Sequence, residues 1–204
     1  KDKPQEVNSF GKVFTDYMFV MDYSKENKWH NPRIEPFKPL ELTPANSIFH
    51  YGQGIFEGLK AYKTKEGEVQ LFRPKDNFLR LNRSAERLCI PKIDVDFMVE
   101  ALKELVKLEK DWIPNEPDKS LYIIPFIIGN DDSVGVKTAE NYKLVIILSP
   151  VASFYKEGLN PVKILVEDKF VRAVRGGLGE AKTLANYAAS LLATKRAQEQ
   201  GYTQ

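Results

Sequence analysis

The sequence has little of what disulfide-bonded, metal-binding and membrane-spanning proteins need. Its 204 residues include one cysteine, which excludes an internal disulfide, and two histidines, so no Cys/His cluster predicts a zinc site. No apolar run reaches the ~18 residues that can cross a bilayer. The formal net charge is +2, which gives no reason to expect nucleic acid as a partner. We therefore expect a cytoplasmic protein with no metal, no nucleic acid partner and no membrane partner.

Turn-forming residues divide the chain into four parts. The polar residues 1–11 are expected to be disordered or a leader. Residues 12–150 alternate strand-like and helix-like apolar patterns, which predicts a small α/β domain. Glycine and prolines in 151–161 predict an interdomain linker. Residues 162–204 begin a second domain that is too short to bury its own apolar faces, so we expect the chain to be a fragment.

Apolar periodicity predicts the elements within these parts. Four prolines in 29–44 predict loop and short extended pieces there. Pro125, inside an otherwise apolar strand pattern, predicts an edge or a bulge. Cys89 is expected to pack as a small apolar residue at a helix end. The predicted strands are 12–23, 56–62, 69–72, 121–129, 144–148 and 162–166, and the predicted helices are 46–53 (a short turn), 74–88, 94–112 and 183–197.

A glycine-rich segment in front of the last predicted helix contains a notable lysine. Gly176, Gly177 and Gly179 permit backbone angles that side chains forbid. The Ala- and Leu-rich run 183–197 predicts a helix. Lys182 therefore lies where a loop gives way to a helix N-terminus, a place suited to an anion.

Spacing alone leaves three interpretations of Lys182 open. The phosphate-loop pattern G-x-x-x-x-G-K-[ST] is nearly met from Gly176 to Thr183, but Ala181 replaces the last glycine. Alternatively, Lys182 is a nucleophile that forms a Schiff base, with the Tyr187 phenol hydrogen-bonded to the carbonyl compound it holds. The third interpretation is a solvated lysine at a helix start.

The lysine segment, Gly-Gly-Leu-Gly-x-x-Lys182-x-x-x-Asn186-Tyr187, resembles that of the branched-chain amino acid aminotransferases. The resemblance runs from about Val13 to the last residue. It implies an α/β (α+β) chain with the D-amino-acid-aminotransferase-like fold (fold type IV) and pyridoxal 5'-phosphate as cofactor. Further matching segments follow in the same order at 47–52, 56–61, 71–74 with Asn77, 83–91, 111–114, 120–122 and 128–130.

The resemblance implies three residues that hold the cofactor. Lys182 would form the Schiff base and move a proton during catalysis. Tyr187 would donate to the ring oxygen, and Arg80 would bind the phosphate, which its planar guanidinium matches. Without the resemblance, Arg80 would be predicted to face water, since it lies off the apolar stripe of its helix.

The resemblance also implies a substrate pocket and a partner subunit. Tyr51, Phe56 and Tyr122 match pocket-lining positions, although the same aromatics would otherwise be predicted as core. The loop 131–135 matches one that the family lends across a dimer interface, which implies a homodimer. Ile124 departs from the family, where an arginine that helps bind glutamate is common, so we expect altered glutamate recognition.

The predicted function is transamination of leucine, isoleucine or valine with 2-oxoglutarate by a pyridoxal-phosphate enzyme. The family's acidic partner for the pyridine nitrogen lies beyond Gln204, so the 204-residue chain alone is expected to be inactive. One alternative is another fold type IV enzyme, either a D-amino-acid aminotransferase or an aminodeoxychorismate lyase. Another is a noncatalytic dimerisation or nucleotide-binding module built on the loop 177–183.

Overall fold

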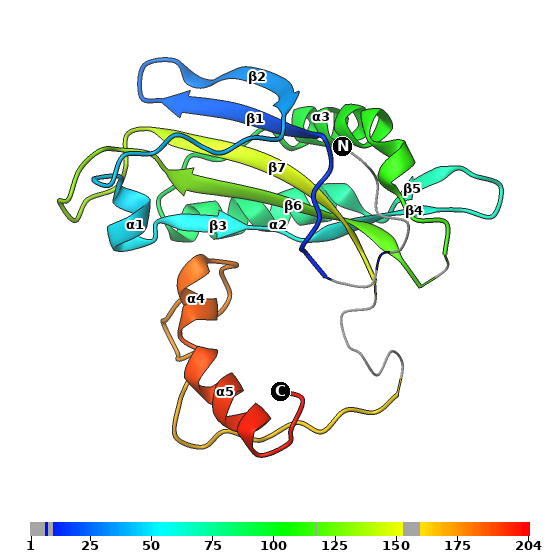
Figure 1. Cartoon of the computed structure of the whole chain (residues 1–204). Coiled ribbons are helices and arrows are strands. Elements are labelled where there is room, and N and C mark those ends of the chain that lie inside the picture. Colours follow the sequence, from blue (N-terminus) through cyan, green and yellow to red (C-terminus); the bar gives the residue numbers. More distant parts are fainter. Residues whose placement is uncertain (1–6, 8–9, 117, 153–159) are drawn as a thin grey trace.

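A seven-stranded antiparallel sheet organises the computed structural model, which describes residues 7, 10–116, 118–152 and 160–204 (Figure 1). The strand order is β2-β1-β7-β6-β4-β5, and β3 pairs with β6 beside β4. The strands are β1 (Tyr17–Ser24), β2 (Lys28–Pro36), β3 (Gly54–Phe56), β4 (Leu59–Lys63), β5 (Val69–Leu71), β6 (Ser120–Gly129) and β7 (Tyr142–Val151).

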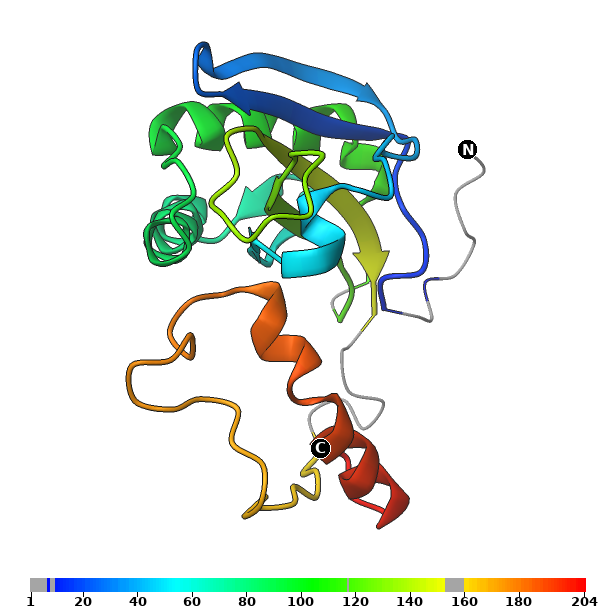
Figure 2. The same ribbon diagram turned by 90° about the vertical axis from the view of Figure 1, so that its left-hand side faces the viewer.

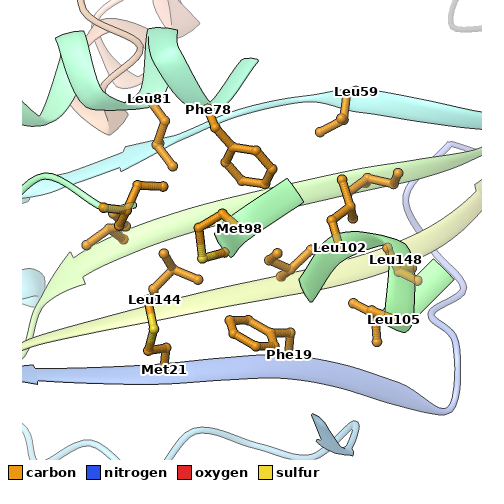
Figure 3. Close-up of a cluster of buried hydrophobic side chains, with 14 of the residues drawn as sticks. Phe19, Met21, Leu59, Phe78, Leu81, Met98, Leu102, Leu105, Leu144 and Leu148 are labelled. Atoms are coloured by element: carbon orange, nitrogen blue, oxygen red, sulfur yellow. The ribbon is translucent and has the colours of Figure 1, made fainter. Parts of the chain in front are cut away.

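Two helices, α2 (Pro74–Arg87) and α3 (Val95–Leu108), cover one face of this sheet (Figure 1). Both were predicted: Pro74 starts α2, and the Asp94 side chain accepts hydrogen bonds from two amides of the first turn of α3. A 3-10 turn at Lys110–Trp112 follows α3. Figure 3 shows how their apolar stripes meet β1 and β7, through Phe78, Leu81, Met98, Leu102, Leu105, Phe19, Met21, Leu144 and Leu148. Each such side chain contributes ~1.5–3 kcal/mol on burial.

The proline-rich stretch after β1 contains the nine-residue strand β2, longer than the short extended pieces predicted within 29–44, whereas 37–44 has no helix or strand. β2 lies at the edge of the sheet, where a proline removes no hydrogen bond from a second neighbour. The register shifts between Val20 and Asp22, so Pro32 falls in an irregularity, beside Asn31 with its φ of 54°. Two of the four prolines, Pro32 and Pro36, are thus compatible with edge pairing.

Pro125 lies in the centre of the sheet and in an unbroken register with β7, so neither the predicted edge nor the predicted bulge is found there. β3 and β4 keep one register along β6, and that register sets Glu57 opposite Pro125. The Glu57 amide donates to the Pro125 carbonyl at 2.7 Å, but proline has no N–H to return the bond. The predicted strand 56–62 is therefore divided into β3 and β4 at Glu57 and Gly58.

The end of α2 corrects the expectation for Cys89, which is exposed rather than packed. Its φ is 56°, in the left-handed region. The Ile90 amide donates to Ala85 and the Cys89 amide to Glu86, which is the hydrogen-bond pattern of a Schellman cap. Cys89 thus occupies the position that glycine usually takes, and Ile90 is the residue that is buried.

The C-terminal residues 160–204 lie beneath the sheet, with α4 (Leu184–Ala188) nearest to α1 (Ser47–Tyr51) and β3 (Figures 1 and 2). The helix predicted over 183–197 is broken into α4 and α5 (Leu191–Glu199). No regular strand forms at 162–166 among the described residues, although Lys163 and Leu165 exchange backbone hydrogen bonds with Thr203 and Gln204.

Two other predictions fall largely outside the described residues. The predicted linker 151–161 includes residues 153–159, which lie outside the described ranges, and β7 extends to Val151. The predicted N-terminal segment 1–11 includes residues 1–6 and 8–9, which also lie outside the described ranges, whereas the centroid of the Phe10 ring lies 5.1 Å from that of Tyr122. Within the described ranges, no helix is long and apolar enough to cross a membrane, and no group of three His, Cys, Asp or Glu side chains could hold a metal ion.

Candidate active site

The Lys182 amine lies between two aromatic rings. Its Nζ donates to the Tyr187 hydroxyl at 2.9 Å and lies 4.4 Å from the centroid of the Phe56 ring. The Phe56 and Tyr187 rings are themselves 4.9 Å apart and tilted. Phe56 comes from the end of β3, and Tyr187 from the single turn of α4 that follows the lysine. This cluster around the amine contains three of the six predicted site residues.

The glycine-rich bend before Lys182 is held by a buried asparagine. The Asn186 side-chain amide donates to the Leu178 carbonyl at 2.8 Å and to the Ala181 carbonyl at 2.6 Å. The bend is tight, since a Cβ at Gly179 would meet that of Ala173 at 2.6 Å. Asn186 belongs to the motif that carries the resemblance, but the sequence analysis assigned it no role. Its position four residues after Lys182, one helical turn along the chain, was the signal that could have indicated this structural role.

The backbone of this bend argues against the phosphate-loop interpretation. Its amides at Gly177, Ala181 and Thr183 donate to carbonyls within the same segment. The Lys182 amide donates to the Ser84 hydroxyl at 2.9 Å. A phosphate loop presents such amides to its ligand. These four are already engaged by the protein, so the lysine side chain is the reactive group that the bend displays.

Arg80 is paired with a carboxylate that the sequence did not single out. Glu57 is fully buried, and its oxygens accept from Arg80 Nε at 2.6 Å and Nη2 at 2.7 Å. Asn77 Nδ2 also donates to Glu57, at 3.1 Å. The hydrogen bonds that Arg80 donates to Glu57 raise the pKa of Arg80 above its ordinary value, against the effect of burial. The charge of Glu57 within the otherwise uncharged stretch 55–59 was the signal that a buried ion pair exists there.

This pairing fixes Arg80 without using up its guanidinium. The Arg80 side chain is 47% exposed, and its Nη1 makes no hydrogen bond to any described residue. A two-point fork sets the plane of the guanidinium, so its remaining donors have a defined direction. Arg80 is therefore suited to hold an oxyanion next to it.

A pocket of about 470 Å³ adjoins these groups. Arg80, Lys182 and Tyr187 line it together with Arg172, which supplies a second cation. The pocket thus presents a nucleophilic amine, a phenol and two guanidinium groups to one volume. This set of groups matches an aldehyde that carries a phosphate, because the amine can attack the carbonyl while arginines bind the phosphate oxygens.

Tyr122 lies at a second, smaller hollow beside β4. Its hydroxyl occupies the space where a Cβ of Gly58 would be, at 2.5 Å from that position. Burial raises the pKa of Tyr122, and the negative charge of Glu57 adds to the shift. Ile124 is half-buried two residues along the same strand, as the alternation of β6 requires. Both side chains therefore lie on the sheet face opposite α2 and α3.

Tyr51, on α1, is tied to the loop 131–135 rather than to the lysine. Its hydroxyl donates to the Val134 carbonyl. Asp131 anchors the loop by accepting from the amides of Glu140 and Asn141, each at 2.9 Å. These bonds lower the pKa of Asp131 although burial opposes ionisation. The structure thus joins two features that the sequence predicted separately, but no contact joins Tyr51 to Lys182 among the described residues.

Solved structures similar to this fold are branched-chain aminotransferases. That of the archaeon Thermoproteus uzoniensis, with norvaline, has a TM-score of 0.73 at 23% identity and covers 92% of this chain and 58% of that one. The Escherichia coli enzyme has a TM-score of 0.68 at 23% identity, over 93% and 58% of the two chains. At such identity the likeness shows the fold alone, which is that of fold type IV pyridoxal-phosphate enzymes.

The sequence carries the family assignment. Residues 54–204 match the model described as amino-transferase class IV, and the chain belongs to that family. It is 56% identical over 204 residues to branched-chain-amino-acid aminotransferase 2 of Bacillus subtilis (strain 168), and 56% identical over 206 residues to that organism's branched-chain-amino-acid transaminase 1. It is 52% identical over 206 residues to a probable branched-chain-amino-acid aminotransferase of Staphylococcus aureus (strain N315). All of this chain is covered, and it spans 56–58% of the length of these relatives.

Proposed function

We propose that this chain is part of a pyridoxal-phosphate-dependent aminotransferase that passes the amino group of leucine, isoleucine or valine to 2-oxoglutarate. One observation carries the proposal: the Lys182 amine, the Tyr187 phenol and the Arg80 guanidinium line a single pocket. The likeness to relatives named as branched-chain aminotransferases supports the substrate class. We further propose that the whole protein is a cytoplasmic homodimer.

The residues of the pocket suit this cofactor. When bound, the cofactor supplies an aldehyde that an amine can attack and a ring that accepts electrons. Arg80, oriented by Glu57, would bind the phosphate, with Arg172 as a second cation. Tyr187 would orient the ring through its hydroxyl. We assign the domains accordingly. Residues 12–150 would be a small domain, joined through 151–161 to a large cofactor-binding domain that begins at 162 and contains Lys182 and Tyr187.

Lys182 would serve both as the anchor and as the proton carrier. Its Nζ hydrogen-bonds Tyr187, so a neutral amine formed there has a phenolic donor within reach. The nearby rings of Phe56 and Tyr187 exclude water from one side of the amine, and exclusion of water strengthens each remaining electrostatic contact. A proton held at Nζ could then be delivered to a substrate carbon in the same pocket.

The apolar aromatics would give the substrate pocket its character. Phe56 lies beside the amine, and the Tyr122 ring packs against Gly58, two residues after Phe56. An aliphatic side chain needs such apolar walls. Tyr51 would enter the pocket together with the loop 131–135, whose Val134 is exposed at 64%, as is the adjoining Val136 at 86%. Exposed apolar residues of this kind support an interface with a second subunit.

The experiment is a transamination assay on the whole protein with added cofactor. Glutamate formation from 2-oxoglutarate is measured with leucine, isoleucine, valine and D-alanine as donors. The proposal predicts turnover of the three branched-chain donors and none of D-alanine. Turnover of D-alanine alone would make the protein a D-amino-acid aminotransferase. If no donor is turned over and the protein binds a nucleotide, the noncatalytic nucleotide-binding module is favoured. The Ile124→Arg variant is expected to lower the KM for glutamate, and an unchanged value would show that Ile124 does not alter glutamate recognition.

A further inference from the structure

We infer that Ser84 is a positioning residue for Lys182, and that helix α2 sets the distance between the lysine and the phosphate-binding Arg80. This inference rests on the proposed function. Ser84 is 1% exposed, and its hydroxyl accepts a hydrogen bond of 2.9 Å from the Lys182 amide, 98 residues further along the chain. The contact joins the helical layer of the sheet domain directly to the backbone of the reactive residue.

The peptide groups of Lys182 are held on both sides. The Lys182 amide donates to Ser84, and the Lys182 carbonyl accepts from the Phe56 amide at 3.0 Å. The fully buried Thr183 hydroxyl donates to the Gly54 carbonyl at 2.8 Å, next to a bridge between Ile55 and Thr183. The backbone of the lysine is therefore fixed to α2 and to β3, although its own segment is irregular.

The same two elements fix Arg80. Ser84 and Arg80 are four residues apart on α2, one helical turn or about 6 Å along the axis. Glu57, which directly follows Phe56, holds the Arg80 guanidinium. The contacts thus form a closed ring that runs from Arg80 along α2 to Ser84, then through Lys182 and Phe56 to Glu57, and back to Arg80.

This ring separates two roles that can be measured apart. Glu57 acts on the phosphate end of the pocket through Arg80, whereas Ser84 acts on the amine end through Lys182. An aldehyde without a phosphate depends on the amine end only. Pyridoxal and pyridoxal phosphate are therefore the two probes that distinguish a defect at one end from a defect at the other.

The experiment titrates each aldehyde into the cofactor-free whole protein and follows its bond to lysine by visible absorbance. Loss of one buried hydrogen bond predicts that Ser84→Ala raises both dissociation constants by the same factor, about fivefold to tenfold. Ser84→Thr keeps the hydroxyl and is expected to retain most of the wild-type affinity. Ser47→Ala is the matched control, since the Ser47 hydroxyl is buried without a hydrogen-bond partner among the described residues.

Three results would overturn the inference. Wild-type affinity of Ser84→Ala for both aldehydes would show that the contact positions nothing. A loss confined to pyridoxal phosphate would assign Ser84 to the phosphate end. An equal loss in Ser47→Ala would show a general effect of buried serines. If Ser84→Ala does not fold, Ser84→Cys provides the same test, because a thiol of similar volume accepts hydrogen bonds weakly. If the wild-type protein binds neither aldehyde at Lys182, the proposed function fails as well.

Discussion

Removing the charge of Glu57 should weaken the site at its phosphate end alone. In Glu57→Gln, an NH2 group replaces one of the two oxygens that Arg80 binds at 2.6 and 2.7 Å. The new donor then faces the donors of Arg80 or Asn77, because both side chains point their N–H groups at Glu57. The two-point fork becomes a single hydrogen bond at best, and the guanidinium loses its fixed plane.

The magnitude follows from burial on each side of the pair. Breaking a buried ion pair costs about 3–5 kcal/mol when the remaining charge is also buried. The Arg80 side chain is 47% exposed, so water can solvate it once Glu57 is neutral. The cost is then that of an unsatisfied buried donor, about 1–3 kcal/mol in the free energy of unfolding. The dissociation constant for pyridoxal phosphate should rise about tenfold, a change of about 1.4 kcal/mol.

Urea unfolding and titration with both aldehydes measure these two effects. The matched control is Glu86→Gln on the same helix, because the Glu86–Lys92 pair is exposed on both sides and should contribute little to stability. Pyridoxal should bind Glu57→Gln as it binds the wild type. If Glu57→Gln unfolds at the wild-type urea concentration, or weakens both aldehydes equally, Glu57 does not act through Arg80.

Three further predictions concern other parts of the chain. Tyr187→Phe removes the hydroxyl that Lys182 Nζ contacts, so transamination should fall about tenfold or more while thermal stability stays within a few degrees, as calorimetry would show. Asp131→Asn should remove a stabilising contribution of about 1–3 kcal/mol at neutral pH. The pKa of Asp131 is lower in the folded than in the unfolded protein, where it lies near ~3.9, so this contribution is fully present above pH ~3.9 and is lost as the pH falls through the folded pKa. The urea midpoints of variant and wild type should therefore converge in acid. Leu102→Ala leaves a cavity between α3 and the sheet and should lower the free energy of unfolding in urea by about 2–5 kcal/mol. Leu108→Ala, at an exposed position of the same helix, should lower it by less than about 0.5 kcal/mol.

The sequence predicted α2 and α3 well because their signals are local. Pro74 and Asp94 mark helix starts, and the apolar spacing of Phe78, Leu81 and Ala85 marks the buried face. The strand errors arose where the effect of proline depends on a neighbour that the sequence does not reveal. β2 tolerates its prolines because it lies at an edge, and Pro125 fits a central strand because the opposite strand is interrupted at Glu57.

The site was predicted in part for the same reason. Lys182 and Tyr187 are five residues apart, so their contact at 2.9 Å could be predicted from spacing and resemblance. The partners Glu57 and Ser84 lie 23 and 98 residues from Arg80 and Lys182, respectively. Such distant contacts depend on how α2 packs on β3, which periodicity alone does not determine.

The most direct test of the account is to find which lysine binds the cofactor aldehyde. The whole protein is mixed with pyridoxal phosphate, treated with borohydride to make the bond permanent, digested, and analysed by mass spectrometry. The account predicts that the modification lies on Lys182 and that Lys182→Ala abolishes both the label and transamination. Modification of another lysine, or full transamination by Lys182→Ala, would contradict it.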